Sequence, residues 1–107
     1  DISKIKINKK NIFLIDESYN SNPLSLKSAI NNFDALKVND SKKHLILGDM
    51  LELGRHSKKL HSGIGAIINK TSIDYVNVIG KNIAETYKNI NKNKKGLILK
   101  KNSHISI

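Results

Sequence analysis

The stretch IFLIDESYNSNPLSL, residues 12–26, decides the fold because it changes from a strand pattern to a helix pattern across one polar loop. Its first four residues form an apolar run too short for a helix, which suits a strand buried on both faces. Asn22 and Pro23 are typical of a helix N-cap and first helical position, since proline has no N–H to lose there. Residues 16–22 therefore form a loop dense in hydrogen-bonding groups.

The same strand, loop and helix pattern repeats along the rest of the chain. Apolar residues at helical spacing predict helices over 23–37 and over 57–70, and a third helix that carries Ile83, Tyr87 and Ile90. Short apolar runs predict further buried strands at 44–48, 75–80 and 96–99. The alternating segment ISKIKI predicts a half-buried strand that NKKN turns back onto residues 12–15. Gly63 and Gly65, inside the second helix, indicate close backbone packing.

This alternation predicts one α/β domain over residues 1–107 with a Rossmann-like, doubly wound, mostly parallel sheet. We expect helices on both faces of the sheet and an N-terminal β-hairpin. The closing segment NSHISI resembles the start of a helix, so we expect a domain truncated at its C-terminus. Ligands of such sheets bind beyond the carboxyl ends of the strands. The loops 16–22, 48–54 and 80–82 should therefore share one edge.

Composition excludes several classes of protein. A net charge of +10 raises nucleic acid as a partner, but Arg55 is the single arginine, the lysines are scattered, and aromatic residues make up 5% of the chain. We therefore expect a solvated lysine surface and no nucleic-acid binding. No apolar run approaches the roughly 18 residues of a membrane span, so we expect no membrane association and a cytoplasmic protein. The absence of cysteine excludes disulfides and thiolate zinc ligands.

Catalytic and metal-binding motifs are also missing. The sequence contains no G-x-x-x-x-G-K-[ST] phosphate-binding loop, no G-x-G-x-x-G, and no H-E-x-x-H. We therefore predict no catalytic residue and no metal site in this chain, which could hold a ligand but could not split ATP by itself.

The polar groups of the first loop suit a nucleotide or a peptide. Carboxylates such as those of Asp16 and Glu17 can accept hydrogen bonds from ribose hydroxyls or approach a metal, and the carboxamides of Asn20 and Asn22 both donate and accept. For Asp16 and Asn22, ordinary turn and helix-cap roles are an open alternative.

The second loop carries Asp49 and Glu52, three residues apart, which one helical turn would place on the same side. Two such carboxylates could orient a cationic amine or contact magnesium indirectly. A capping or surface role fits the spacing equally well. We expect Met50, Leu51 and Leu53 to serve packing.

Taken together, DESYNSNP (16–23), LGDMLELG (47–54) and His61 closely resemble the C-terminal domain of the Mur ligases. The family pattern reads approximately D-[DE]-S-Y-N-A-N-P, then G-D-M-x-E-L-G, then a histidine on the following helix. Ser21 stands where alanine is usual, and Glu17 where aspartate is frequent. The resemblance covers residues 1 to about 80 and thins from residue 81, where a family domain would continue to a strand with a K-G-S type motif.

The resemblance implies ATP-dependent amide formation in the cytoplasmic stage of peptidoglycan synthesis. Within the family, the match is to members that join D-alanyl-D-alanine to UDP-N-acetylmuramoyl-tripeptide. There the substrate carboxylate becomes an acyl phosphate, which the dipeptide amine attacks. ATP and Mg²⁺ are bound mainly by a central domain, so that domain and the N-terminal domain are the implied partners. The chain alone would be inactive.

The resemblance also implies roles for individual residues. ATP contacts fall to Glu17, Ser18, Tyr19 and Asn20, and dipeptide contacts to Asn20, Asn22, Asp49 and Glu52. For His61 it favours a supporting hydrogen bond to the 47–54 segment over proton transfer.

An alternative function for the whole chain is that of a small flavodoxin-like module that binds a nucleotide or a protein. A receiver domain, one such module, would need an acid after the third buried strand, and none follows YVNVIG.

Overall fold

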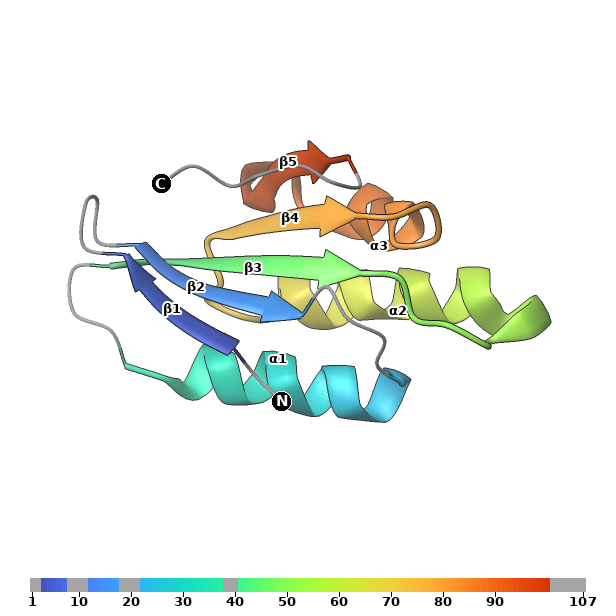
Figure 1. Ribbon diagram of the computed structural model, residues 1–107, viewed down its shortest axis with the longest axis horizontal. Helices are drawn as coiled ribbons and strands as arrows, with labels where there is room; N and C mark the ends of the chain where they lie inside the picture. The colour runs from blue at the N-terminus through green and yellow to red at the C-terminus, as the bar shows by residue number, and fades with distance from the viewer. Residues whose placement is uncertain (1–2, 8–11, 18–21, 38–40, 101–107) are drawn as a thin grey trace.

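The structure is a computed structural model that describes residues 3–7, 12–17, 22–37 and 41–100, the first two segments as backbone only. Its elements follow one another in an alternating α/β order (Figure 1). They are β1 (Ser3–Ile7), β2 (Ile12–Glu17), α1 (Pro23–Ala35), β3 (Lys42–Gly48), η2 (Gly54–His56), α2 (Ser57–Asn69), β4 (Tyr75–Ile79), α3 (Ala84–Asn89), η3 (Lys92–Lys94) and β5 (Lys95–Leu99). Within these residues, no helix combines the length and apolarity needed to cross a bilayer.

The strands form one open sheet in the order β1-β2-β3-β4-β5. β1 pairs antiparallel with β2 as a hairpin, and β2, β3, β4 and β5 are parallel neighbours. Parallel neighbours require crossover connections, and α1, α2 and α3 supply them. The predicted α/β fold with a mostly parallel, Rossmann-like sheet and an N-terminal hairpin is therefore confirmed.

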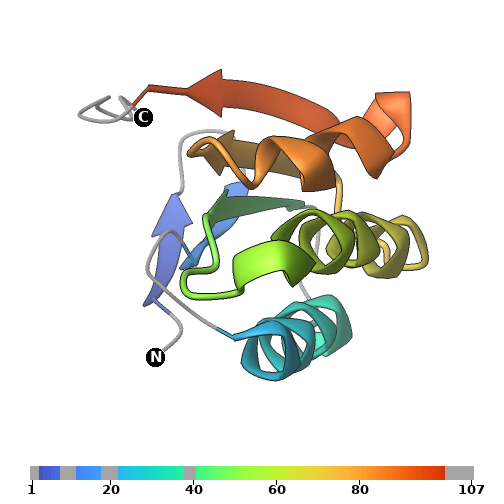
Figure 2. The ribbon, with the colours of Figure 1, turned by 90° about the vertical axis from the view of Figure 1, so that its right-hand side faces the viewer.

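The described helices cover one face of the sheet, whereas the sequence led us to expect helices on both faces (Figure 2). The reason is the strand order, which runs sequentially without a reversal among the described strands. Right-handed crossovers that all step in the same direction place their helices on the same side. The sequence pattern predicts that strands and helices alternate, but it does not predict on which side of the preceding strand each new strand pairs.

The core lies between this helical layer and the sheet. Side chains of β3 and β4 that point toward the helices pack with the apolar stripes of α1 and α2. Each of the residues in this cluster is at most 4% exposed, and the members are Leu26, Ile30, Phe33, Leu45, Leu47, Met50, Ile64, Ile68, Ile73, Val76, Val78, Ile83 and Ile90. One continuous core thus joins α1, α2 and α3 to the sheet.

Helix α1 begins as the sequence predicts and ends earlier. The Asn22 side chain accepts a hydrogen bond from the Ser25 N–H at 2.8 Å, and Pro23 is the first helical residue. At the other end, Leu36 leaves the helix with an extended backbone (ψ 130°) while still packing against the core. The prediction of a helix to residue 37 followed this apolar side chain past the end of the helical backbone.

Helices α2 and α3 approach each other closely at Gly65. A Cβ added there would lie 2.8 Å from Asn89 Cβ and 2.9 Å from the Thr86 carbonyl oxygen, so larger residues do not fit. Close packing at Gly65 is therefore confirmed. At Gly63 a Cβ would meet nothing within 4 Å, so the packing prediction is wrong for that glycine.

Candidate functional site

Loops that are far apart in sequence leave the sheet from a single edge. Glu17 lies beside Leu47 in the register of β2 and β3, and Leu47 lies beside Val78 in that of β3 and β4. Because these strands are parallel, their carboxyl ends lie on the same side, at the right of Figure 1. We call this edge the carboxyl rim. The expectation that the polar segments share one edge is confirmed for residues 22, 48–54 and 80–82 and for the end of β2, whereas residues 18–21 lie outside the described residues.

The structure places only part of the first polar segment. β2 continues through Asp16 and Glu17, which we had assigned to the loop, because both residues remain paired with β3. Ser18, Tyr19 and Asn20 lie outside the described residues. Asn22 lies at the rim as the N-cap of α1, and its carboxamide oxygen is occupied by the Ser25 N–H. The capping role that the sequence left open for Asn22 is thus present.

The second polar segment is tied to the turn after β4. Asp49 follows β3 directly, and its Oδ1 accepts a hydrogen bond from the Ile83 N–H at 2.7 Å. Ile83 is fully buried at the start of α3. Asp49 therefore joins two loops of the rim, a contact that the sequence did not reveal because its partner is a backbone group 34 residues away.

His61 ties the same segment to α2. Its Nε2 lies 3.0 Å from the Met50 backbone nitrogen, and its Nδ1 lies 2.8 Å from the Ser57 carbonyl oxygen. A backbone N–H can only donate and a carbonyl can only accept, so the network assigns the proton to Nδ1 and leaves Nε2 as acceptor. His61 is fully buried, and its own carbonyl accepts from the Thr86 hydroxyl. The imidazole is thus engaged at both nitrogens.

Beyond these anchors the segment turns outward. Leu51 is 53% exposed, which differs from the packing role we expected for it. Met50 and Leu53 do pack against the core. Glu52 is exposed and has a φ of +62°, a left-handed conformation that non-glycine residues rarely adopt.

The spatial relation predicted between Asp49 and Glu52 is wrong. Residues 49–53 do not form a helical turn, so the three-residue spacing does not place the two carboxylates on one helix face. Asp49 turns toward Ile83, whereas Glu52 is exposed at the rim. The two carboxylates therefore have different environments.

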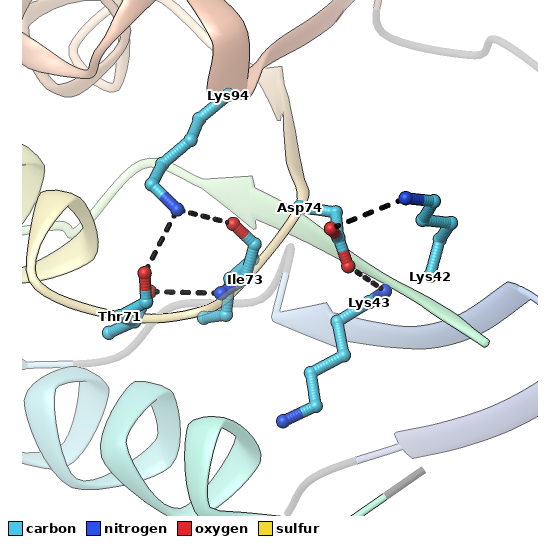
Figure 3. A network of polar contacts seen from close by, with 6 residues as sticks. All are labelled: Lys42, Lys43, Thr71, Ile73, Asp74 and Lys94. Carbon is cyan, nitrogen blue, oxygen red and sulfur yellow. Dashed lines mark hydrogen bonds and ion pairs between the residues drawn. The ribbon is translucent and has the colours of Figure 1, made fainter. Parts of the chain in front are cut away.

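A second polar network lies at the opposite, amino-terminal edge of the parallel strands (Figure 3). The Lys94 ammonium donates to the carbonyl oxygens of Thr71 and Ile73, at 2.9 and 2.7 Å. The Asp74 carboxylate accepts from the Lys43 backbone N–H at 2.8 Å and lies 4.0 Å from the Lys42 ammonium. These contacts tie the starts of β3, β4 and β5 together, so we assign this network to stability.

The described residues offer no ready-made metal centre. Among them, no group of three or more His, Asp or Glu side chains is arranged to hold a metal ion. The chemistry available at the carboxyl rim is hydrogen bonding by carboxylates, carboxamides and backbone groups, which can bind and orient a substrate.

Comparison with known proteins identifies relatives of the chain. The family model described as "Mur ligase, glutamate ligase domain" matches residues 4–106. The chain is similar to the UDP-N-acetylmuramoyl-tripeptide–D-alanyl-D-alanine ligases of Bacillus subtilis (43% identical over 68 residues, 64% of the chain) and Haemophilus influenzae (42% over 66 residues, 62% of the chain). It is also similar to that of Buchnera aphidicola (38% over 91 residues, 85% of the chain). The matched regions span 15%, 14% and 19% of these relatives, so the chain corresponds to less than a fifth of their length.

Proposed function

The chain belongs to the family of the Mur ligase, glutamate ligase domain, and we propose that it is the C-terminal substrate-binding domain of an ATP-dependent peptidoglycan ligase. The reaction would add D-alanyl-D-alanine to UDP-N-acetylmuramoyl-tripeptide in the cytoplasm, as the names of the similar ligases suggest. Residues 1–107 would form this one domain, with the N-terminal and central domains of the same ligase as its partners.

The observation that carries the proposal is that β2 and β3, which lead into the two family segments, end at the same edge of the sheet. The first segment, DESYNSNP, begins with Asp16 and Glu17, which end β2 and pair with β3, and the second, GDMLELG, begins at the end of β3. Strands that are parallel neighbours present both segments to the same ligand. A domain that uses this rim could contact the nucleotide with one segment and the incoming dipeptide with the other.

The two family segments carry polar groups that suit the binding of a dipeptide and a nucleotide. Exposed carboxylates such as that of Glu52 attract the ammonium group of a dipeptide, and carboxamides can bind peptide or nucleotide edges. Buried His61 holds the second segment through Met50. We assign ATP contacts to Glu17, Ser18, Tyr19 and Asn20, and dipeptide contacts or pocket shape to Asn20, Asn22, Asp49 and Glu52.

The domain would contribute binding and closure rather than the chemical groups of phosphoryl transfer. Mg²⁺ and the phosphates of ATP are assigned to the central domain, where they would activate the tripeptide carboxylate as an acyl phosphate. Closure of the rim over that site would position the dipeptide amine and exclude water that would hydrolyse the acyl phosphate. The chain alone would therefore form no product.

Complementation in trans tests this proposal. The N-terminal and central domains of the Bacillus subtilis relative would be incubated with this chain, ATP, Mg²⁺, UDP-N-acetylmuramoyl-tripeptide and D-alanyl-D-alanine. We expect pentapeptide product by mass spectrometry, with none when either protein or the dipeptide is omitted. The relative's own C-terminal domain is the positive control. Product with that control and none with this chain would overturn the proposal and favour the flavodoxin-like alternative.

A further inference from the structure

The carboxylate of Asp49 is enclosed by the turn that connects β4 to α3. Its Oδ1 accepts the Ile83 N–H at 2.7 Å, and Ile83 is the N-cap residue of α3, whose backbone N–H has no partner within that helix. An acceptor from outside the helix is needed there, because a buried N–H without a partner is unfavourable. Asp49 supplies it from the end of β3.

Gly80 shapes the other side of this contact. Its φ is +133°, which strongly favours glycine, and a Cβ added to it would lie 2.5 Å from Asp49 Oδ1 and 2.7 Å from Cγ. The Asp49 carboxylate thus fills the space that any larger residue at position 80 would need. Gly80 and Asp49 form one fitted contact between the loops after β4 and β3.

The consecutive residues Asp49 and Met50 are therefore anchored to two different elements. Asp49 is held by the start of α3, and the Met50 N–H is held by His61 of α2. The next two residues, Leu51 and Glu52, are exposed at the rim, and the positive φ of Glu52 fixes the direction of the turn. The anchors decide where this exposed tip points.

We propose that Asp49 is a positioning residue for the dipeptide site and does not itself contact the dipeptide. Its hydrogen bond to Ile83 fixes the direction of the Leu51–Glu52 tip, and the Glu52 carboxylate is the group that meets the substrate ammonium. This inference rests on the proposed function and deepens it by dividing the two acidic residues of the segment into one support and one contact.

Replacing Asp49 with asparagine distinguishes a positioning role of this residue from direct contact with the dipeptide. Asp49→Asn keeps an oxygen that can accept the Ile83 N–H but removes the charge, whereas Asp49→Ala removes both. A positioning residue is rescued by asparagine. A residue that binds the ammonium group directly is not, because most of its contribution comes from the negative charge.

The experiment is steady-state kinetics of the full-length ligase that carries this chain, with D-alanyl-D-alanine as varied substrate. We expect Asp49→Ala to raise the KM for the dipeptide about tenfold or more, and Asp49→Asn to stay within about threefold of wild type. Glu52→Gln should raise KM as much as Asp49→Ala. Glu85→Ala, which removes an acid from α3 without touching the Asp49 contact, is the matched control. Equal KM increases for Asp49→Asn and Asp49→Ala would overturn the proposal.

Hydrogen exchange tests the Asp49–Ile83 contact independently of the proposed ligase function. In the same full-length protein, Asp49→Ala should speed exchange in the peptide that contains the Ile83 amide, and Asp49→Asn should not. Unchanged exchange in Asp49→Ala would overturn the anchoring contact whether or not the protein ligates. A wild-type protein without dipeptide-dependent ligation would instead overturn the proposed function, and with it the role of Asp49 in dipeptide binding.

Gly80→Ala gives a second route to the same conclusion. Its Cβ would displace the Asp49 carboxylate, so we expect the KM increase and the faster Ile83 exchange of Asp49→Ala. In the double variant the two effects on KM should be less than additive, since both act through one contact. Fully additive effects would contradict the shared contact.

Discussion

The Lys43 ammonium donates a hydrogen bond to the Asp34 carbonyl oxygen at 2.7 Å, although Lys43 is only 7% exposed. Asp34 lies in the last turn of α1, where carbonyl groups have no partner within the helix and a positive charge is favourable. The ammonium also lies 5.9 Å from the centre of the Phe33 ring. Lys43 therefore joins the start of β3 to the end of α1.

We predict that Lys43→Met lowers the free energy of unfolding by about 1 kcal/mol, because it removes a charge-assisted hydrogen bond but also the cost of burying the charge. The methionine side chain keeps the packing over Phe33. Lys42→Met is the matched control, since the Lys42 side chain is 65% exposed and lies 4.0 Å from Asp74. It should change stability by less than about 0.5 kcal/mol. Urea unfolding followed by circular dichroism would measure both, and equal losses would contradict the role of Lys43.

A second prediction concerns His61, which accepts the Met50 N–H inside the core. His61→Leu leaves that N–H without its partner in a buried site, which costs about 1–3 kcal/mol. We expect this loss of unfolding free energy, together with faster exchange of the Met50 amide. Ser62→Ala, at the adjacent position of α2, should change neither quantity. An unaltered Met50 amide in His61→Leu would show that the hydrogen bond does not hold the segment.

A third prediction concerns pH and His44. Burial lowers the pKa of His44 below its usual 6.5, and the nearby Asp74 carboxylate opposes this effect without cancelling it. The ring also lies 4.9 Å from the Tyr75 ring. Because the folded chain holds the proton less tightly than the unfolded chain, this group contributes stability above about pH 6.5 that is lost as pH falls through the folded pKa.

Unfolding measurements between pH 5 and pH 7.5 would test this effect of His44. We expect His44→Gln to lose less stability on acidification than the wild-type protein over that range. His56→Gln, which changes an exposed residue, should keep the wild-type pH dependence. If the unfolding free energy of His44→Gln depends on pH as steeply as that of the wild-type protein, His44 is not the group responsible.

The sequence predicted those features that follow from local patterns. The start of α1 was recognisable from Asn22 and Pro23, and the shared rim followed from parallel strands with crossover helices. The end of β2 was not recognisable, because aspartate and glutamate are uncommon in strands. Asp16 and Glu17 nevertheless stay in the sheet, where they pair with β3. Tertiary pairing overrides local preference at such positions.

The details of the candidate site depend on distant contacts and were missed for that reason. The Ile83 N–H that meets Asp49 belongs to a different crossover, and no local pattern links the two. The left-handed backbone of Glu52 is also unexpected, because glutamate has no preference for positive φ. Leu51 was expected to serve packing together with Met50 and Leu53, and the outward turn at Glu52 leaves it exposed.

The last prediction concerns Asn77, which bridges three strands. Between Val76 and Val78 of β4, β5 carries one extra residue, so the ladder of backbone hydrogen bonds is interrupted there. The Asn77 carboxamide fills the gap, accepting the Leu97 N–H at 2.8 Å and donating to the Leu45 carbonyl oxygen at 3.3 Å. Gly96 must lack a side chain, because a Cβ there would meet the Asn77 Oδ1 and lie 2.9 Å from the Val76 carbonyl oxygen.

We expect Asn77→Ala to lower the unfolding free energy by about 1–2 kcal/mol, since the Leu97 N–H and the Leu45 carbonyl both lose a partner. Leu97→Ala is the control, because the Leu97 side chain is 65% exposed and its backbone N–H remains bonded. It should stay within about 0.5 kcal/mol of wild type. Urea unfolding measures the loss of unfolding free energy, and amide hydrogen exchange shows whether β5 is the strand that is destabilised. If Asn77→Ala is no less stable than Leu97→Ala, water replaces the carboxamide and the bulge does not depend on Asn77.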